Sequence, residues 1–151
     1  TVHTIMKIHF TLTIGLIFLL NIINLNINFA QSEILGTWKS IDDNTGEAKS
    51  HIQLFKKGDK LFGKITQLLE AAQDAVCESC KGKLKDKPLL GMEVIWDMEA
   101  EGNQWKGGTI IDPETGNKYK CKLWVEDGVL KVRGIHWTGI YRTQEWQRVD
   151  E

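Results

Sequence analysis

The chain has 151 residues, of which 42% are hydrophobic and 26% charged, and its formal net charge at pH 7 is −1. This length suits a single domain. The only basic cluster, Lys81, Lys83, Lys85 and Lys87, is interrupted by Asp86. A nearly neutral chain without a long basic stretch lacks the electrostatic footprint of a nucleic-acid-binding protein, so we expect no nucleic-acid partner.

The first thirty residues have the pattern of a secretory signal peptide preceded by a few upstream residues. Met6-Lys7 gives a basic start, residues 8–29 are rich in Ile, Leu and Phe, and Ala30 ends the run with a small residue. A retained membrane anchor is the alternative, since about 20 apolar residues span a bilayer. Four asparagines between Asn21 and Asn28 favour cleavage instead. We therefore expect export to a periplasm or to the medium, with cleavage after Ala30, a mature domain over residues 31–151 and no membrane span after cleavage.

From Gly36 onward, apolar residues alternate with polar ones between short glycine-bearing turns, which is typical of antiparallel strands. The Gly107-Gly108 pair predicts a bulge or bend, and Asp127-Gly128 predicts a hairpin turn. Evenly spaced short strands favour an all-β, antiparallel, up-and-down barrel, because closure removes exposed edges and leaves room for side chains or one small ligand. Eight strands are predicted, at residues 36–41, 51–55, 61–66, 92–97, 105–111, 119–125, 129–137 and 139–149.

One segment, residues 67–89, interrupts this pattern. It is too long for an ordinary hairpin connection, and long loops are usually functional or flexible. We expect a short helix or a flap over one end of the barrel. The segment also carries the Cys77-x-x-Cys80 motif.

The three cysteines allow three single pairings, and export favours an oxidised pair. Cys77–Cys80 is the local choice, whereas a bond from either to Cys121 would join the flap to the sixth strand. A zinc site needs about four ligands, and only Cys121 and the distant His51 and His136 remain. A thioredoxin-like motif needs a βαβ unit that the pattern does not offer. We therefore predict a structural disulfide, no metal and no cofactor.

Several motifs together resemble the exported bacterial family catalogued as DUF2147. They are Gly36-Thr37-Trp38 and the segments 77–82, 88–92, 112–116, 119–123 and 142–146, and they occur in the family's order. The resemblance covers residues 36–149. It implies a lipocalin-like eight-stranded barrel and an exported protein, and it implies no settled activity.

A looser similarity links the chain to lipocalins and fatty-acid-binding proteins. Those proteins carry Gly-x-Trp on the first strand and an arginine on the last strand that packs over the tryptophan. Gly36, Trp38 and Arg142 match this arrangement, with Arg148 as the other candidate for the stacking partner. A guanidinium over an indole face contributes roughly 0.5–2 kcal/mol, so the similarity implies a structural role in closing the barrel.

Alternation along the strands gives the candidate ligand-binding residues. Parity places Tyr119 and His136 on inward faces, and Trp96 shares the phase of Val94. Polar and aromatic groups on such faces orient ligands in mostly apolar pockets, although packing of the core is their more common role. The predicted ligand-binding set is Trp96, Tyr119, His136 and Tyr141, with Glu145 beside Tyr141 on the last strand, or Arg142 as the alternative there.

These observations favour an exported, non-enzymatic protein that holds a small apolar or amphipathic ligand in the barrel, with the flap as a gate. The alternative is a protein–protein interaction module of the cell envelope with a filled barrel, acting through Trp124 or the lysine-rich flap. An enzyme has the least support, because parity brings together neither a pair of carboxylates nor a nucleophile and a base.

Overall fold

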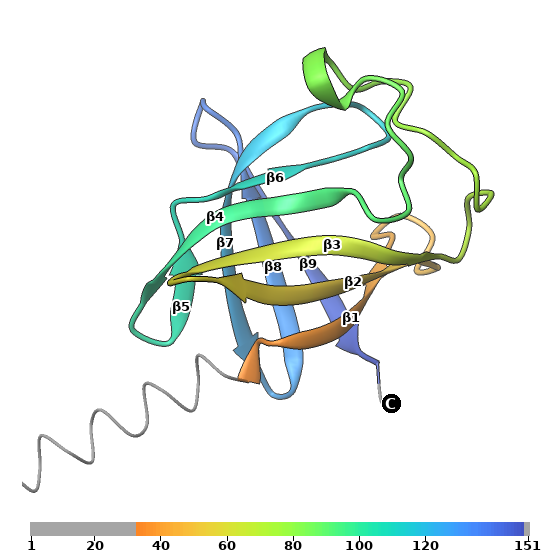
Figure 1. The fold of residues 1–151 in the computed structure, drawn as a ribbon. Coiled ribbons are helices and arrows are strands. Elements are labelled where there is room, and N and C mark those ends of the chain that lie inside the picture. Colours follow the sequence, from red (N-terminus) through yellow and green to blue (C-terminus); the bar gives the residue numbers. More distant parts are fainter. Residues whose placement is uncertain (1–32, 150–151) are drawn as a thin grey trace, which may run out of the picture.

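The structure is a computed structural model that describes residues 33–149, and the predicted signal peptide and its cleavage site lie outside them. The described part is a single β-barrel with one short 3₁₀ turn, η1 (Figure 1). The strands are β1 (Gly36–Ile41), β2 (Ala48–Lys57), β3 (Lys60–Leu68), β4 (Glu93–Glu101), β5 (Gln104–Lys106), β6 (Thr109–Ile111), β7 (Lys118–Glu126), β8 (Val129–Ile135) and β9 (Tyr141–Arg148), and η1 is Gly82–Leu84.

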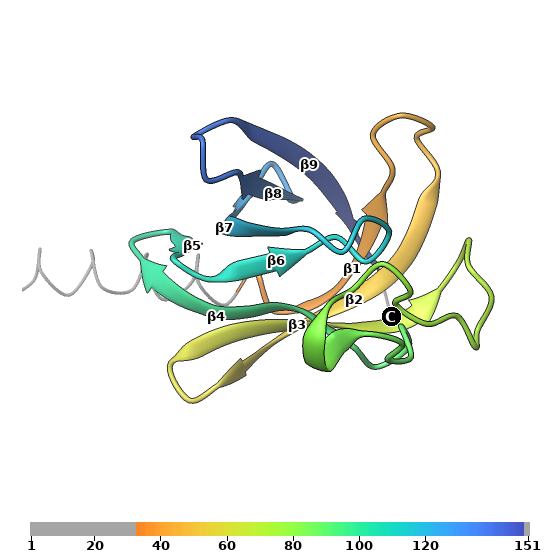
Figure 2. The same cartoon turned by 90° about the horizontal axis from the view of Figure 1, so that it is seen from above.

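The strands form a closed antiparallel meander, seen from above in Figure 2. Consecutive strands pair with each other, except β5 with β6, and β9 returns to pair with β1. The short β5 and β6 both lie between β4 and β7, so they are two halves of one barrel strand. The predicted eight-stranded up-and-down barrel is therefore confirmed.

The break between β5 and β6 falls at the Gly107-Gly108 pair, as predicted. Gly107 has a φ of +78°, a conformation that side chains rarely adopt. A Cβ on Gly108 would lie 2.4 Å from the carbonyl oxygen of Trp96. The chain therefore bends here because only glycine allows β4 to approach so closely.

One half of the barrel interior is filled by tightly packed apolar side chains. Alternate residues of every strand point inward, and those of this half are almost completely buried. They include two indoles, four leucines and a methionine: Trp38, Leu54, Leu61, Met98, Trp105, Leu123 and Leu130. This half supplies the hydrophobic core of the domain.

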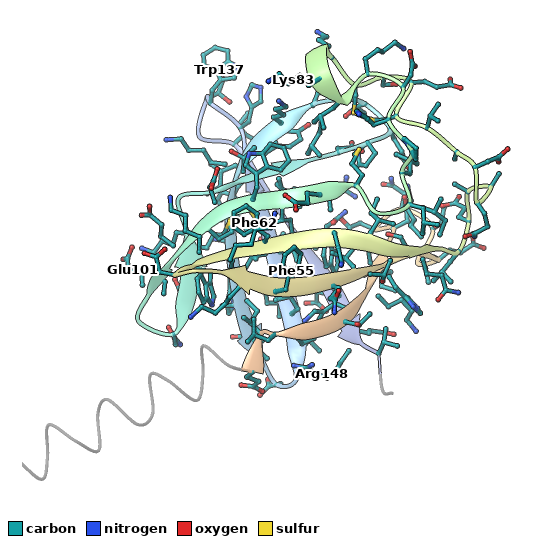
Figure 3. All side chains as sticks on the ribbon, in the orientation of Figure 1. Phe55, Phe62, Lys83, Glu101, Trp137 and Arg148 are labelled. Carbon is teal, nitrogen blue, oxygen red and sulfur yellow. A yellow bond between two sulfur atoms is a disulfide. The ribbon has the colours of Figure 1, made fainter. Side chains whose placement is uncertain are left out.

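The barrel closes through Trp38 and Arg148, at the end opposite the exposed Trp137 (Figure 3). The Arg148 guanidinium lies 4.3 Å from the centre of the Trp38 ring and donates a hydrogen bond to the carbonyl of Leu35. The Trp38 indole N–H donates to the carbonyl of Ile34 at 2.9 Å. A Cβ on Gly36 would lie 2.7 Å from Arg148 Nη1, so glycine makes room for the stack.

The prediction that Arg142 stacks on Trp38 was wrong, and the alternative, Arg148, holds that place. The two end strands are antiparallel, and Trp38 is paired with Arg148 in the register. Arg142 lies at the start of β9, at the other end of the barrel, and forms an ion pair with Asp43 at 2.6 Å.

The seam between β1 and β9 is short. The register pairs these strands at only two positions, Trp38 with Arg148 and Lys39 with Gln147. In contrast, β8 and β9 pair at seven positions. Beyond Lys39 the two strands separate, and the Arg142–Asp43 ion pair spans the gap.

The flap between β3 and β4 is held together by internal bonds and contacts one turn of the barrel. A disulfide joins Cys77 to Cys80, which are close in sequence, and neither is bonded to Cys121. Both residues are buried. The Cys77 N–H donates to the carbonyl of Lys87 at 2.9 Å. The flap also rests on the β6–β7 turn, because Cys77 Sγ lies 3.4 Å from the carbonyl oxygen of Pro113. Within the described residues, the flap contains the 3₁₀ turn η1 and no other helix.

Labelling of thiols should distinguish the three cysteines. Burial raises the pKa of the Cys121 thiol, so it stays protonated and unreactive in the folded protein. We expect a maleimide reagent to label no cysteine in the native protein, one after unfolding without reductant, and three after unfolding with reductant. Intact mass spectrometry gives these numbers, and three labels without reductant would rule out the Cys77–Cys80 bond.

Candidate functional site: the open half of the barrel

The other half of the barrel encloses a cavity of about 520 Å³. It lies away from the Trp38–Arg148 closure and opens among the last residues of β1, β3 and β8, the first residues of β2, β7 and β9, and the flap. Ligand cavities usually measure about 300–1,000 Å³. The barrel is therefore half packed and half open.

The deep wall of the cavity is apolar. Aliphatic side chains from five strands line it, together with the indole of Trp146 on β9. They are Ile52, Ile65, Leu68, Val94, Ile110, Ile111 and Val132. Burial of an apolar group against this wall would be favourable by roughly 25 cal/mol per Å².

A few polar groups interrupt this wall. The Ser40 and Ser50 hydroxyls are 2.9 Å apart, and Ser40 also donates to the carbonyl of Ser50. The carboxamide oxygen of Gln144 accepts a hydrogen bond from the Trp146 indole at 3.2 Å. Such isolated polar groups orient a ligand in an apolar pocket.

The mouth of the cavity is charged, and its two cations are both paired. Lys49 contacts Asp42 at 2.7 Å and also Glu114. Arg142 pairs with Asp43. Although its partial burial opposes the shift, hydrogen bonds to Asp42 and Glu114 raise the pKa of Lys49 above its ordinary value.

The pKa of Asp42 is held well below its usual range by the hydrogen bond from Lys49 and by the backbone N–H groups of Thr45 and Asn44. A lowered carboxyl pKa contributes stability that is present above the unfolded pKa of about 3.9 and is lost as the pH falls toward the folded value. We therefore expect the melting temperature to fall on acidification below about pH 5.

In Asp42→Asn this acid-dependent loss should be smaller, whereas Asp59→Asn, in the exposed β2–β3 turn, should retain it. Thermal melts followed by circular dichroism between neutral and acidic pH measure the difference. Equal acid dependence in Asp42→Asn and the unsubstituted protein would contradict the assigned role of Asp42.

Of the predicted ligand-binding residues, the structure brings Tyr119, His136 and Tyr141 to the cavity. Tyr119 and His136 have the inward phase that parity gave them. Tyr141 is paired with Ile135 on the outer phase, and the Arg133 guanidinium lies 4.3 Å from its ring centre, so it reaches only the rim. Arg142, the alternative on this strand, has the inward phase because it is paired with Gly134.

Trp96 does not line the cavity, so its predicted place in the pocket was wrong. It is paired with Thr109 on the outer face, where the Lys118 ammonium lies 5.6 Å from its ring centre. The neighbouring Ile95 takes the inward position, and both Val94 and Ile95 are buried. The register of β4 against β3 shifts twice, and the extra residue between Glu93 and Ile95 reverses which side chains point inward between Val94 and Trp96.

Sequence reasoning missed the polar pair Ser40 and Ser50, Gln144 and the charged mouth. Parity could have placed Ser40 inward, since it lies two residues after Trp38. It could not show that the carboxylates of the β1–β2 and β6–β7 turns meet at Lys49, because they come from distant parts of the chain.

The β8–β9 turn carries two exposed apolar side chains at the mouth. Trp137 is 88% exposed and Ile140 is 74% exposed, and Ile140 also lines the cavity. The turn is ordered by a hydrogen bond from the His136 N–H to the carbonyl of Ile140, and by His136 Nδ1 lying 2.8 Å from the Thr138 hydroxyl.

Two further properties concern the part of the chain that the structure covers. Between residues 33 and 149, no group of three or more His, Cys, Asp or Glu side chains is placed to hold a metal ion. Within the same residues, no helix has the length and apolar character needed to cross a membrane.

A closed eight-stranded meander with one packed end and one open end defines a lipocalin-like barrel, and comparison with known proteins agrees. A solved structure described as "Protein HP1028 from the human pathogen Helicobacter pylori belongs to the lipocalin family" superposes with a TM-score of 0.69 at 15% sequence identity, over 78% of this chain and 84% of that one. The chain belongs to the family described as "Uncharacterized protein conserved in bacteria (DUF2147)", which matches residues 36–148. Comparison with curated protein sequences found no match.

Proposed function

We propose that this protein is a non-enzymatic binding protein that holds a small apolar or amphipathic molecule in the open half of its barrel. The observation that carries this proposal is the cavity of about 520 Å³, with its apolar deep wall and polar mouth. A core that is packed in one half and hollow in the other is difficult to explain by stability alone, because unfilled apolar space lowers stability. The lipocalin-like fold is consistent with ligand binding.

We also propose that the protein acts after export, in a periplasm or in the medium. The buried Cys77–Cys80 disulfide supports this, since such bonds persist in oxidising compartments. The pattern of residues 1–30 in the sequence points the same way.

The alternative, an interaction module with a filled barrel, has less support. The barrel is open in one half. Trp124, its expected contact residue, is half-buried between the Lys122 ammonium at 5.2 Å and the Arg133 guanidinium at 5.0 Å from its ring centre.

Filling the cavity should test the proposed function. Gly134 lines the cavity, and a Cβ there would meet its nearest neighbour, Tyr119 Cβ, at an ordinary 3.5 Å. Gly134→Leu should therefore fold and occupy the space that a ligand needs. Because the leucine side chain takes space that the dye needs, we expect Gly134→Leu to weaken binding of Nile red, a neutral apolar dye, by about tenfold or more. A tenfold change corresponds to about 1.4 kcal/mol of binding free energy.

The matched control is Thr109→Leu, which adds a leucine to the outer face at the same end of the barrel. It should leave the dissociation constant of Nile red unchanged. Fluorescence titration measures both, and thermal melts verify that both variants fold. Equal binding by Gly134→Leu and the unsubstituted protein, or no dye binding at all, would contradict a ligand site in the cavity.

A further inference from the structure

The charges at the mouth restrict which ligand can bind, and this inference rests on the proposed function. An amphiphile that buries its apolar part against the deep wall leaves its polar end at the mouth, among the ends of β1, β7 and β9. The side chains there decide which head group is tolerated. Carboxylates outnumber cations among them: Asp42, Glu70, Asp112 and Glu114 line the cavity together with Lys49 and Arg142.

Each lining cation already contacts a carboxylate. Lys49 lies between two carboxylates, Asp42 and Glu114. Arg142 is held by Asp43 at 2.6 Å, and Asp43 is itself part of the β1–β2 turn beside the mouth. An anionic head group would compete with these carboxylates for the two cations and would lie near the other acidic side chains of the lining.

The remaining lining carboxylates add to this effect. Asp112 accepts hydrogen bonds from the Glu114 N–H and the Thr115 hydroxyl, so it is fixed in its turn. Glu70 is exposed at the start of the flap and has no ion pair among residues 33–149. Like charges at short range repel, and this repulsion is only partly screened at a half-enclosed site.

We propose that the cavity binds amphiphiles whose head group is neutral or positively charged, such as an alcohol or an amine, and discriminates against free carboxylates. The Arg142–Asp43 ion pair is the element that sets this selectivity. It places the guanidinium on the cavity wall with its Nε paired to a carboxylate, so an acidic ligand meets a cation whose charge is already offset. The Ser40 and Ser50 hydroxyls and the Gln144 carboxamide offer neutral hydrogen bonds deeper in the cavity.

The test uses dodecanol, dodecylamine and dodecanoate, which share one alkyl chain and differ only in the head group. Displacement of Nile red, measured below the micelle concentration of each compound, gives three inhibition constants. We expect dodecanoate to bind on the order of tenfold more weakly than dodecanol, a difference of the size that one unfavourable charge contact produces. Dodecylamine should bind at least as tightly as dodecanol.

A gain of affinity should follow when Arg142 loses its partner. Asp43→Asn frees the guanidinium, so we expect dodecanoate to bind severalfold more tightly to this variant than to the unsubstituted protein, with dodecanol unchanged. Glu145→Gln is the matched control. It removes one carboxylate and its ion pair with Lys131, Glu145 lies on β9 like Arg142, and it is exposed outside the cavity lining. Its affinities should stay at the values of the unsubstituted protein.

The outcomes separate the two proposals. If Nile red does not bind, or if it binds and none of the three compounds displaces it, the proposed function fails. If dodecanoate binds the unsubstituted protein as tightly as dodecanol or more tightly, the cavity binds amphiphiles but the head-group selectivity is overturned. If dodecanoate is disfavoured and Asp43→Asn does not improve its binding, the role assigned to the Arg142–Asp43 pair is overturned.

Discussion

Trp38→Ala is expected to lower the free energy of unfolding by about 3–5 kcal/mol, the range found when large aromatic side chains are removed from packed cores. Trp38 is fully buried at the closed end of the barrel. Its removal would leave a void, uncover the face on which Arg148 stacks, and take the hydrogen-bond donor away from the Ile34 carbonyl. Urea unfolding monitored by circular dichroism measures the loss.

Trp38→Phe is the matched control, because it keeps an aromatic face for Arg148 and loses mainly the indole N–H. Its cost should be smaller, about 1–2 kcal/mol, which is the usual consequence of leaving one buried acceptor without its donor. A loss below about 1 kcal/mol in Trp38→Ala would contradict the assignment of this end as the part of the barrel that fixes closure.

Gly116→Ala is the second substitution for which we expect a large effect. Gly116 has a φ of +71°, and a Cβ there would lie 2.0 Å from the carbonyl oxygen of Ser79 in the flap. The left-handed conformation alone costs a non-glycine residue roughly 1–2 kcal/mol, and relief of an overpacked contact costs about 1–3 kcal/mol more. We therefore expect a loss of about 2–5 kcal/mol, with the flap displaced from the β6–β7 turn.

Gly128→Ala isolates the contact from the backbone strain. Gly128 has a similar φ of +75°, and a Cβ there would meet nothing within 4 Å. This variant should lose only the strain contribution of about 1–2 kcal/mol. Limited proteolysis provides a second measurement, since cleavage within the flap should become faster in Gly116→Ala alone. Equal stability losses in the two variants would show that the flap does not rest on Gly116.

The strands could be predicted because their signals are local. Alternation of apolar residues, the Asp127-Gly128 turn and the Gly107-Gly108 break each depend on a few neighbouring residues. The turn-forming role of Asp112 is also local, and its carboxylate accepts hydrogen bonds within its own turn.

The errors arose where the answer depends on register between strands. A shift within β4 turned Trp96 outward, although counting in twos from Val94 placed it inward. The choice between Arg142 and Arg148 depends on how the last strand is aligned with the first, and no local pattern encodes that alignment. The cavity depends on the summed packing of all the strands, so alternation predicts its walls but not its volume.

The short seam between β1 and β9 has a consequence for how the barrel moves. Beyond Lys39, the two strands are not paired with each other, and the Arg142–Asp43 contact is what bridges them. Moving β1 and β9 apart beyond Lys39 breaks no backbone pairing between them, whereas moving β8 and β9 apart would break seven register pairs. The barrel should therefore open most easily between β1 and β9. The amide protons at this seam should exchange with solvent before those of β8.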